Sequence, residues 1–91
     1  MELLWTSKGL SDLTRLYEFL APINKSAAVR TIQVMTLTTT GLIANPRIGE
    51  RLEEFEPREI RRVLAGQYEI RYEIQGSVIY ILRLWHTRED R

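Results

Sequence analysis

Residues 68–74 alternate strictly between apolar and charged side chains, and the apolar positions are Tyr68, Ile70, Tyr72 and Ile74. Successive side chains of a β-strand point to opposite faces of the sheet, so this pattern predicts a strand with one buried and one polar face. The following run, 78–85, is apolar except for Arg83. Such a run is typical of a strand that is covered on both faces and lies in the centre of its sheet.

Glycines mark the connections around the alternating strand. Gly66 precedes it and Gly76 follows it, at positions where a tight turn needs a positive φ. A weaker strand, with Ile60, Val63 and Leu64 as its apolar residues, comes before Gly66. Strands joined by short turns pair as antiparallel neighbours, so the last third of the chain is predicted to be a three-stranded antiparallel meander.

The first half of the chain has a helical period instead. Thr6 or Ser7 is positioned to cap a first helix, and Pro22 ends it. The apolar stripe and the polar side of this helix are predicted from three- and four-residue spacing. The stripe consists of Leu10, Leu13, Tyr17 and Leu20 with Leu16 and Phe19 beside them, and the polar side consists of Asp12, Arg15 and Glu18.

A second helix is predicted directly after the first. Asn24 can cap it, and its apolar line is formed by Ala28, Ile32, Met35 and Leu42. Two helices joined by about three residues run antiparallel as a hairpin. The helical region ends at Asn45–Pro46, and residues 45–57 are expected to form a surface loop with one turn of helix.

These elements predict a single α+β domain over residues 1–91. It begins with a strand at Leu3–Trp5, continues with the antiparallel helical hairpin, and ends with the three-stranded antiparallel meander, forming one sheet. A second core would leave each half of the chain below about 50 residues, which argues for one domain. One face of the sheet is expected to bury against the hairpin.

Several kinds of chemistry are excluded by the residues that are missing. The chain has no cysteine and one histidine, His86, so a thiol nucleophile and a two-histidine metal site are both ruled out. No phosphate loop or nucleophile motif is present, and no cofactor or metal is expected. No apolar run approaches about 18 residues, and the first residues do not resemble a signal peptide. The expected location is the cytoplasm.

Arginine supplies 11 of the 13 basic residues, because Lys8 and Lys25 are the only lysines. Many of these arginines fall in the predicted meander and its flanks: Arg58, Arg61, Arg62, Arg71, Arg83, Arg88 and Arg91. On an open sheet face they could clamp a phosphodiester, with His86 as general acid or base. Alternatively they pair with the carboxylates of the same region, namely Glu59, Glu69, Glu73, Glu89 and Asp90. The near balance of signs favours pairing. Trp5 and Trp85 are expected to pack in the core or at an edge.

At this point the chain resembles a known family. The resemblance rests on the order and spacing of several segments: 68–74 and 79–91, the opening Trp5-Thr6 followed by the first helical stripe, Ala27-Ala28, and Asn45-Pro46-Arg47-Ile48-Gly49. In these segments the chain is similar to the RelE/ParE superfamily of bacterial type II toxins. The resemblance covers essentially the whole chain. It implies a small toxin that a co-expressed antitoxin neutralises in a hetero-oligomer, with an amphipathic antitoxin helix or strand packing on the hairpin or the sheet edge.

The superfamily contains two activities, and the resemblance favours the ParE-like one. RelE-like members cleave mRNA in the ribosome, whereas ParE-like members inhibit DNA gyrase. The nuclease branch tends to carry arginine after the tyrosine that opens the middle strand, where this chain has Glu69, and it also tends to carry an aromatic hydroxyl or a lysine cluster near its site. Here Thr87 follows His86, and both lysines lie in the predicted helical region. The loss of one charge-stabilising group typically costs about 100-fold or more in rate.

The resemblance therefore predicts a gyrase inhibitor with no catalytic residue of its own. Its candidate target-binding residues are Arg58, Arg62, Arg83, His86 and Arg88. The alternative is an endonuclease acting on mRNA in the 70S ribosome, in which the candidate catalytic residues are His86, Arg83, Arg88, Arg62 and Arg71. A third possibility is a toxin fold that retains antitoxin binding only.

Overall fold

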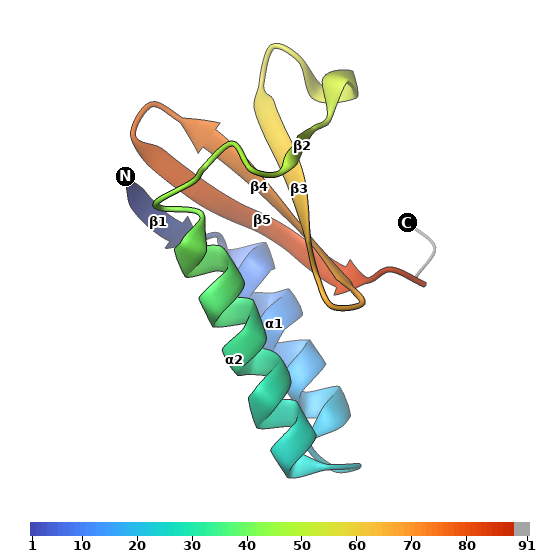
Figure 1. Ribbon diagram of the computed structural model, residues 1–91. Coiled ribbons are helices and arrows are strands. Elements are labelled where there is room, and N and C mark those ends of the chain that lie inside the picture. The colour runs from blue at the N-terminus through green and yellow to red at the C-terminus, as the bar shows by residue number, and fades with distance from the viewer. Residues whose placement is uncertain (89–91) are drawn as a thin grey trace.

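Two helices and a five-stranded sheet make up the fold (Figure 1). The computed structural model describes residues 1–88, so Glu89, Asp90 and Arg91 lie outside the described residues. In chain order the elements are β1 (Glu2–Trp5), α1 (Ser7–Leu20), α2 (Lys25–Gly41), β2 (Glu50–Arg51), the 3-10 helix η1 (Glu53–Phe55), β3 (Glu59–Ala65), β4 (Tyr68–Gln75) and β5 (Val78–His86). The predicted α+β class is confirmed.

The sheet has the strand order β1-β5-β4-β3-β2. β3, β4 and β5 form the predicted antiparallel meander, and the φ angles of Gly66 and Gly76, 61° and 59°, are positive as expected for its turns. Two features extend this prediction. β1 joins the sheet as the parallel neighbour of β5, with Leu3 opposite Ile79. The segment predicted as a loop with one helical turn contains η1 but also β2, which pairs with β3.

The helices begin at the predicted caps. The hydroxyl of Thr6 accepts the N–H of Gly9 at 3.1 Å, and the side chain of Asn24 accepts the N–H of Ala27 at 3.0 Å. The threonines late in α2 have low helix propensity, yet the helix continues to Gly41. The hydroxyls of Thr36 and Thr39 bond to carbonyls one turn earlier. Thr39, for example, donates to the carbonyl of Met35 at 2.9 Å.

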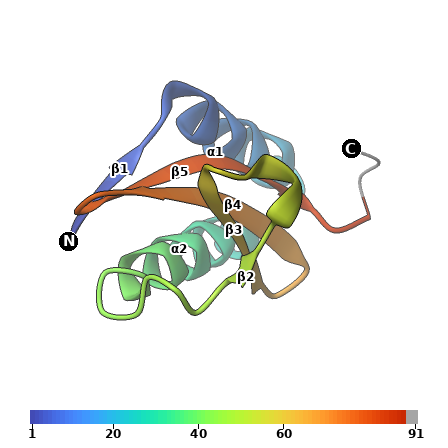
Figure 2. The same cartoon turned by 90° about the horizontal axis from the view of Figure 1, so that it is seen from above.

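The core lies between the hairpin and one face of the sheet. In the view from above, α1 lies beside β5 and α2 lies on the side of β3 (Figure 2). Buried core residues come from α2, from its C-cap and from β3, β4 and β5. They include Met35, Leu42, Ile70, Tyr72, Ile74, Ile79, Ile81 and Leu84. The hairpin connection projects beyond the sheet in Figure 1, which leaves part of both helices without a strand beside it.

The prediction for α1 is wrong at three positions. Leu10 and Phe19, assigned to the apolar side, are exposed, whereas Asp12, assigned to the polar side, is 4% exposed. The reason is that α1 approaches β5 with Gly9 and Asp12. A Cβ on Gly9 would lie 2.6 Å from the carbonyl oxygen of Ile81, so only glycine allows this close approach.

The register of β5 changes in its middle. Tyr72 pairs with Ile81 and Arg71 pairs with Arg83, so Leu82 is an extra residue in β5. Such a bulge shifts the alternation by one residue. Consequently Ile79 and Ile81 face the core before the bulge, and Leu84 faces it afterwards.

Candidate functional site

Within residues 1–88, the end of β5 has no strand neighbour on the α1 side, and polar side chains of α1 and its N-cap take the place of one. β1 ends opposite Ile81, where the Thr6 hydroxyl donates to the Ile81 carbonyl at 2.8 Å. Further along, Asp12 accepts the backbone N–H of Leu84 at 3.0 Å. A carboxylate on a helix therefore satisfies a strand edge that would otherwise be unpaired.

Asp12 is also the centre of an ion-pair cluster. Its carboxylate accepts from Arg83 Nε at 2.8 Å and Nη2 at 3.3 Å, and it contacts Arg15 one turn away on α1. Burial raises the pKa of the Asp12 carboxyl, but the bonds from Arg83 and Leu84 and the charges of Arg83 and Arg15 outweigh it. The net effect is a pKa below the ordinary value, so Asp12 is ionised at neutral pH.

A cleft of about 260 Å³ opens beside this cluster, between α1 and the adjoining ends of β4 and β5. Most of the residues that line it are aromatic or apolar, and two, Asp12 and Arg15, are charged. The lining residues are Asp12, Arg15, Leu16, Phe19, Tyr68, Leu84, Trp85 and His86. The Phe19 residue is 69% exposed. A cleft of this composition suits an apolar or aromatic side chain of a partner.

Both ring nitrogens of His86 are engaged. Nδ1 accepts the backbone N–H of Arg88 at 3.1 Å, and Nε2 lies 3.1 Å from the side-chain oxygen of Gln67. Since a backbone N–H can only donate, Nδ1 is unprotonated and Nε2 carries the hydrogen donated to Gln67. The ring also meets Tyr68 edge-on, at a centroid distance of 5.2 Å. His86 is thus held in place as part of the cleft wall.

Three arginines form a row across the sheet, because Arg62 pairs with Arg71 and Arg71 pairs with Arg83. Like charges directly opposite each other destabilise a sheet unless they are compensated. Each member of the row has a carboxylate partner. Arg62 bonds to Glu50 and Glu69, Arg71 bonds to Glu69, and Arg83 bonds to Asp12.

Two of the glutamates on β4, Glu69 and Glu73, are buried. Glu69 is 7% exposed and Glu73 is 4% exposed, although both lie on the sheet face away from the hairpin. Arg58 covers Glu73 through two bonds of 2.9 and 2.7 Å, which hold the pKa of that carboxyl below its ordinary value. The guanidinium of Arg71 stacks on Trp85 at 4.8 Å. The predicted pairing of arginines with carboxylates is confirmed for Glu59, Glu69 and Glu73.

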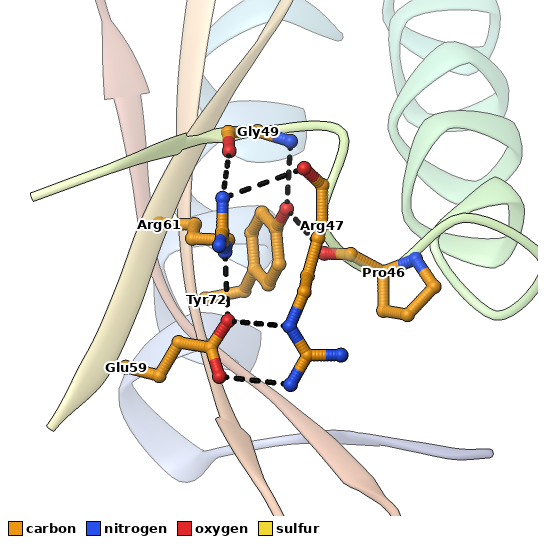
Figure 3. Close-up of polar contacts among 6 residues, drawn as sticks. All are labelled: Pro46, Arg47, Gly49, Glu59, Arg61 and Tyr72. Carbon is orange, nitrogen blue, oxygen red and sulfur yellow. Dashed lines mark hydrogen bonds and ion pairs between the residues drawn. The ribbon is translucent and has the colours of Figure 1, made fainter.

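The segment 46–49 is fixed by a second buried group, Tyr72. The Tyr72 hydroxyl donates to the carbonyl of Pro46 at 2.7 Å and accepts the N–H of Gly49 at 3.0 Å (Figure 3). Burial raises the pKa of this hydroxyl. A Cβ on Gly49 would lie 2.6 Å from the Tyr72 hydroxyl and 2.5 Å from the carbonyl oxygen of Arg62, so the segment packs on β3 and β4 only because residue 49 is glycine.

Arg61 and Glu59 hold the same segment from β3. Arg61 donates to the carbonyl of Gly49 at 2.7 Å and to Glu59 at 2.9 Å. Arg47 reaches the same carboxylate with two bonds of 2.9 and 3.0 Å, and Figure 3 shows Glu59 between the two guanidinium groups. The bonds from Arg47 and the nearby Arg61 lower the pKa of the Glu59 carboxyl despite its partial burial.

The structure distributes the predicted site residues over three places. Arg58, Arg62 and Arg71 lie on the sheet face away from the hairpin, each bonded to a glutamate. Arg83, the cross-strand neighbour of Arg71, bonds to Asp12 at the edge of β5, and His86 and Arg88 line a hollow next to the cleft with Tyr68. The structure therefore brings Arg62, Arg71 and Arg83 together in one row, while His86 and Arg88 lie beside Tyr68.

The roles of two residues, Asp12 and Tyr72, could not be predicted from the sequence. Asp12 looks like an ordinary charged residue on the polar side of an amphipathic helix, and no pattern signals its burial. Tyr72 was assigned correctly to the buried face, but its hydroxyl partners lie 23 and 26 residues earlier in the chain. The Pro46–Gly49 motif was the available signal, because a buried tyrosine needs a hydrogen-bond partner and a loop with proline and glycine can offer backbone groups.

Within residues 1–88, no helix is long and apolar enough to cross a membrane. The same residues contain no group of three or more side chains arranged to hold a metal ion.

This fold and motif set match a known family of toxins. A family model described as the ParE toxin of the type II toxin-antitoxin system parDE matches residues 3–91. The chain belongs to this family of ParE toxins, which confirms the resemblance and its ParE-like branch. One solved structure with the same fold is described as the chromosomal ParDE TA system from P. aeruginosa. It has a TM-score of 0.79 and 22% sequence identity, over 94% of this chain and 95% of that chain. A search of curated proteins finds no match.

Proposed function

We propose that this ParE toxin inhibits DNA gyrase by binding it, without catalysis of its own, and that a cognate antitoxin neutralises it in a hetero-oligomer. The proposed target places its action in the cytoplasm. The observation that carries the proposal is the engagement of the sheet arginines by carboxylates of the same chain. Arg58, Arg62 and Arg71 compensate Glu50, Glu69 and Glu73. A nuclease would need these cations for the developing charge on a phosphate.

The geometry of His86 supports the same conclusion. Its two nitrogens are occupied by Gln67 and by the backbone of Arg88, and Glu69 on β4 and Asp12 on α1 place carboxylates on the elements beside β5. A general acid or base must reach its substrate proton directly or through one water. In the alternative function, the ribosome-dependent endonuclease, His86 would have to give up one of these bonds.

The cleft between α1 and the ends of β4 and β5 is the proposed antitoxin site. It combines exposed Phe19 with Leu16, Tyr68 and Trp85, and Asp12 and Arg15 are its charged lining residues. An antitoxin segment that folds on binding can place an apolar anchor there. Hydrogen exchange should show protection of α1 and the end of β5 when antitoxin is added, and unchanged exchange would place the antitoxin elsewhere.

Gyrase inhibition is tested with purified toxin in a supercoiling assay. The toxin is expected to reduce supercoiling of relaxed plasmid in a concentration-dependent way and to lose this effect when antitoxin is added. Full supercoiling at a large molar excess of toxin would contradict the proposal. A parallel primer-extension assay on a translated message tests the alternative, since cuts in the ribosomal A site that disappear in His86→Ala would identify a nuclease.

A further inference from the structure

The segment 46–51 combines a fixed backbone with an exposed apolar side chain. The Ile48 residue is 63% exposed. Backbone groups on both sides of it are bonded: the carbonyl of Pro46 and the N–H of Gly49 to Tyr72, and the carbonyl of Gly49 to Arg61 (Figure 3). The N–H of Ile48 itself donates to the carbonyl of Asn45 at 3.2 Å. Ile48 is therefore presented on a backbone that the sheet holds in one conformation.

An exposed apolar side chain on a fixed backbone is a suitable anchor for a protein partner. Binding loses less conformational entropy when the loop is already ordered. Other exposed apolar residues, such as Leu64 on β3 and Leu37 on α2, also lie on an ordered backbone. Residues 46–49 differ from them in forming a loop whose backbone is held by side chains of β3 and β4. Nothing in the packing of the described residues requires an isoleucine at position 48.

Charged residues of both signs lie around Ile48: Arg47, Arg51 and Arg61 are positive, and Glu53 and Glu54 follow Arg51 on η1. Arg47 and Arg61 share one carboxylate, Glu59, so this cluster has a net charge of one positive unit. Arg51 is exposed, and no carboxylate among residues 1–88 forms an ion pair with it. Glu50, between Ile48 and Arg51, is bonded to Arg62. A partner with an apolar recess and a carboxylate facing Arg47 and Arg61 would complement this side of the surface.

The segment 46–51 lies far from the proposed antitoxin cleft. The cleft is lined by the start of β4 and the end of β5. Figure 1 shows these strand ends at the opposite end of the sheet from the segment that follows α2. A partner anchored in the cleft and a partner anchored on Ile48 would thus contact different ends of the molecule.

We propose that the segment 46–51 is the surface with which this toxin contacts gyrase, with Ile48 as the apolar anchor and Arg47 and Arg51 as its flanking cations. The partner site is an apolar recess bordered by carboxylates. This inference rests on the proposed function, because it names the contact surface for the same target. It also places the target contact away from the arginine row of the sheet face.

The test compares Ile48→Ala, Ile48→Asp and Arg51→Glu with Leu64→Ala. Leu64 is a matched control because it is an exposed apolar residue, 60% exposed, on the sheet face that carries Arg62. In a supercoiling assay the toxin concentration that gives half inhibition is expected to rise by about tenfold for Ile48→Ala, the loss of one buried apolar side chain. Ile48→Asp and Arg51→Glu should weaken inhibition further, while Leu64→Ala stays near wild type.

Thermal unfolding and antitoxin affinity distinguish the possible outcomes. All four variants should unfold near the wild-type temperature and bind antitoxin with wild-type affinity. If wild-type toxin does not inhibit gyrase, the proposed function is wrong and the inference is wrong with it. If wild type inhibits gyrase and the Ile48 variants behave like Leu64→Ala, only the inference is overturned. Loss of antitoxin affinity with unchanged gyrase inhibition would assign this surface to the antitoxin and also overturn it.

Discussion

The hydroxyl of Tyr72 offers the sharpest test of how the segment 46–49 is held. Tyr72 has no exposed surface, and its oxygen links the Pro46 carbonyl to the Gly49 N–H. Tyr72→Phe removes only that oxygen. The Gly49 N–H then loses its acceptor in a buried position, at a cost of about 1–3 kcal/mol, while the part-buried Pro46 carbonyl can recruit water and adds less. We expect the free energy of unfolding to fall by about 2 kcal/mol, which corresponds to about 8–16 °C in Tm for a domain of this size.

Urea denaturation followed by tryptophan fluorescence measures this loss, since Trp5 and Trp85 both pack in the fold. Tyr80→Phe is the matched control. Tyr80 lies on β5, and its hydroxyl has no hydrogen-bond partner within residues 1–88, so its removal should change stability by about 0.5 kcal/mol at most. Equal losses in the two variants would refute the structural role of the Tyr72 hydroxyl. A looser segment should also inhibit gyrase less, if Ile48 is the anchor.

Two further predictions concern the contact between α1 and β5 and the ionised carboxylates. Gly9→Ala should destabilise the protein, because its Cβ would lie 2.6 Å from the Ile81 carbonyl oxygen. A Cβ at Gly41 would have no atom within 4 Å, so Gly41→Ala should leave stability unchanged or raise it by about 0.5–1 kcal/mol. Thermal unfolding compares the two variants, and equal shifts in Tm would contradict the close approach of α1 to β5. The carboxyls of Asp12, Glu59 and Glu73 have folded-state pKa values below their ordinary values of 3.8, 4.5 and 4.5. As the pH falls, the unfolded chain therefore binds protons before the folded protein does. Stability is lost as the pH falls through the ordinary pKa values and on through the lower folded-state values. Urea titrations from about pH 7 to about pH 3 should show this decline, and Asp12→Asn should make it shallower; an unchanged slope would mean that Asp12 contributes nothing to it.

The meander could be predicted from the sequence because its information is local. Strand alternation and the two turn glycines specify β3, β4 and β5 within residues 59–86, and each strand pairs with its neighbour in the chain. The position of β1 could not be predicted in this way. Its pairing depends on contacts such as that between Thr6 and Ile81, which are 75 residues apart. β2 consists of two exposed charged residues, and only its bonds to β3 make it a strand.

The polar interactions of the site depend even more on tertiary structure. A helix pattern predicts that a charged residue faces solvent, and Asp12 contradicts this because β5 brings Arg83 and the N–H of Leu84 to it. The bulge at Leu82 helps to create that arrangement, since it changes which face of β5 the following residues occupy. No local signal in the apolar run 78–85 reveals a bulge. The sequence could therefore indicate the strand but not the register that positions its only arginine.

The alternating glutamates and arginines of residues 58–73 could either pair within the fold or bind a target, and the burial of the glutamates shows that they pair within the fold. A carboxylate as buried as Glu73 must be paired, so Arg58 is required for the fold whether or not it also contacts a target. Arg58→Gln should therefore lower stability by leaving Glu73 uncompensated, and Arg58→Gln with Glu73→Gln should recover much of the loss.

This double-variant cycle also separates fold from target binding. Both Arg58→Gln and the double variant lack the guanidinium, but only the single variant leaves a buried charge unpaired. Urea denaturation and the supercoiling assay are applied to both, with the double variant of Arg71 and Glu69 as a second case on the same face. If gyrase inhibition recovers along with stability, Arg58 serves the fold alone. If stability recovers and inhibition does not, the guanidinium itself contacts the target, and the sheet face, rather than the segment 46–51 alone, carries recognition.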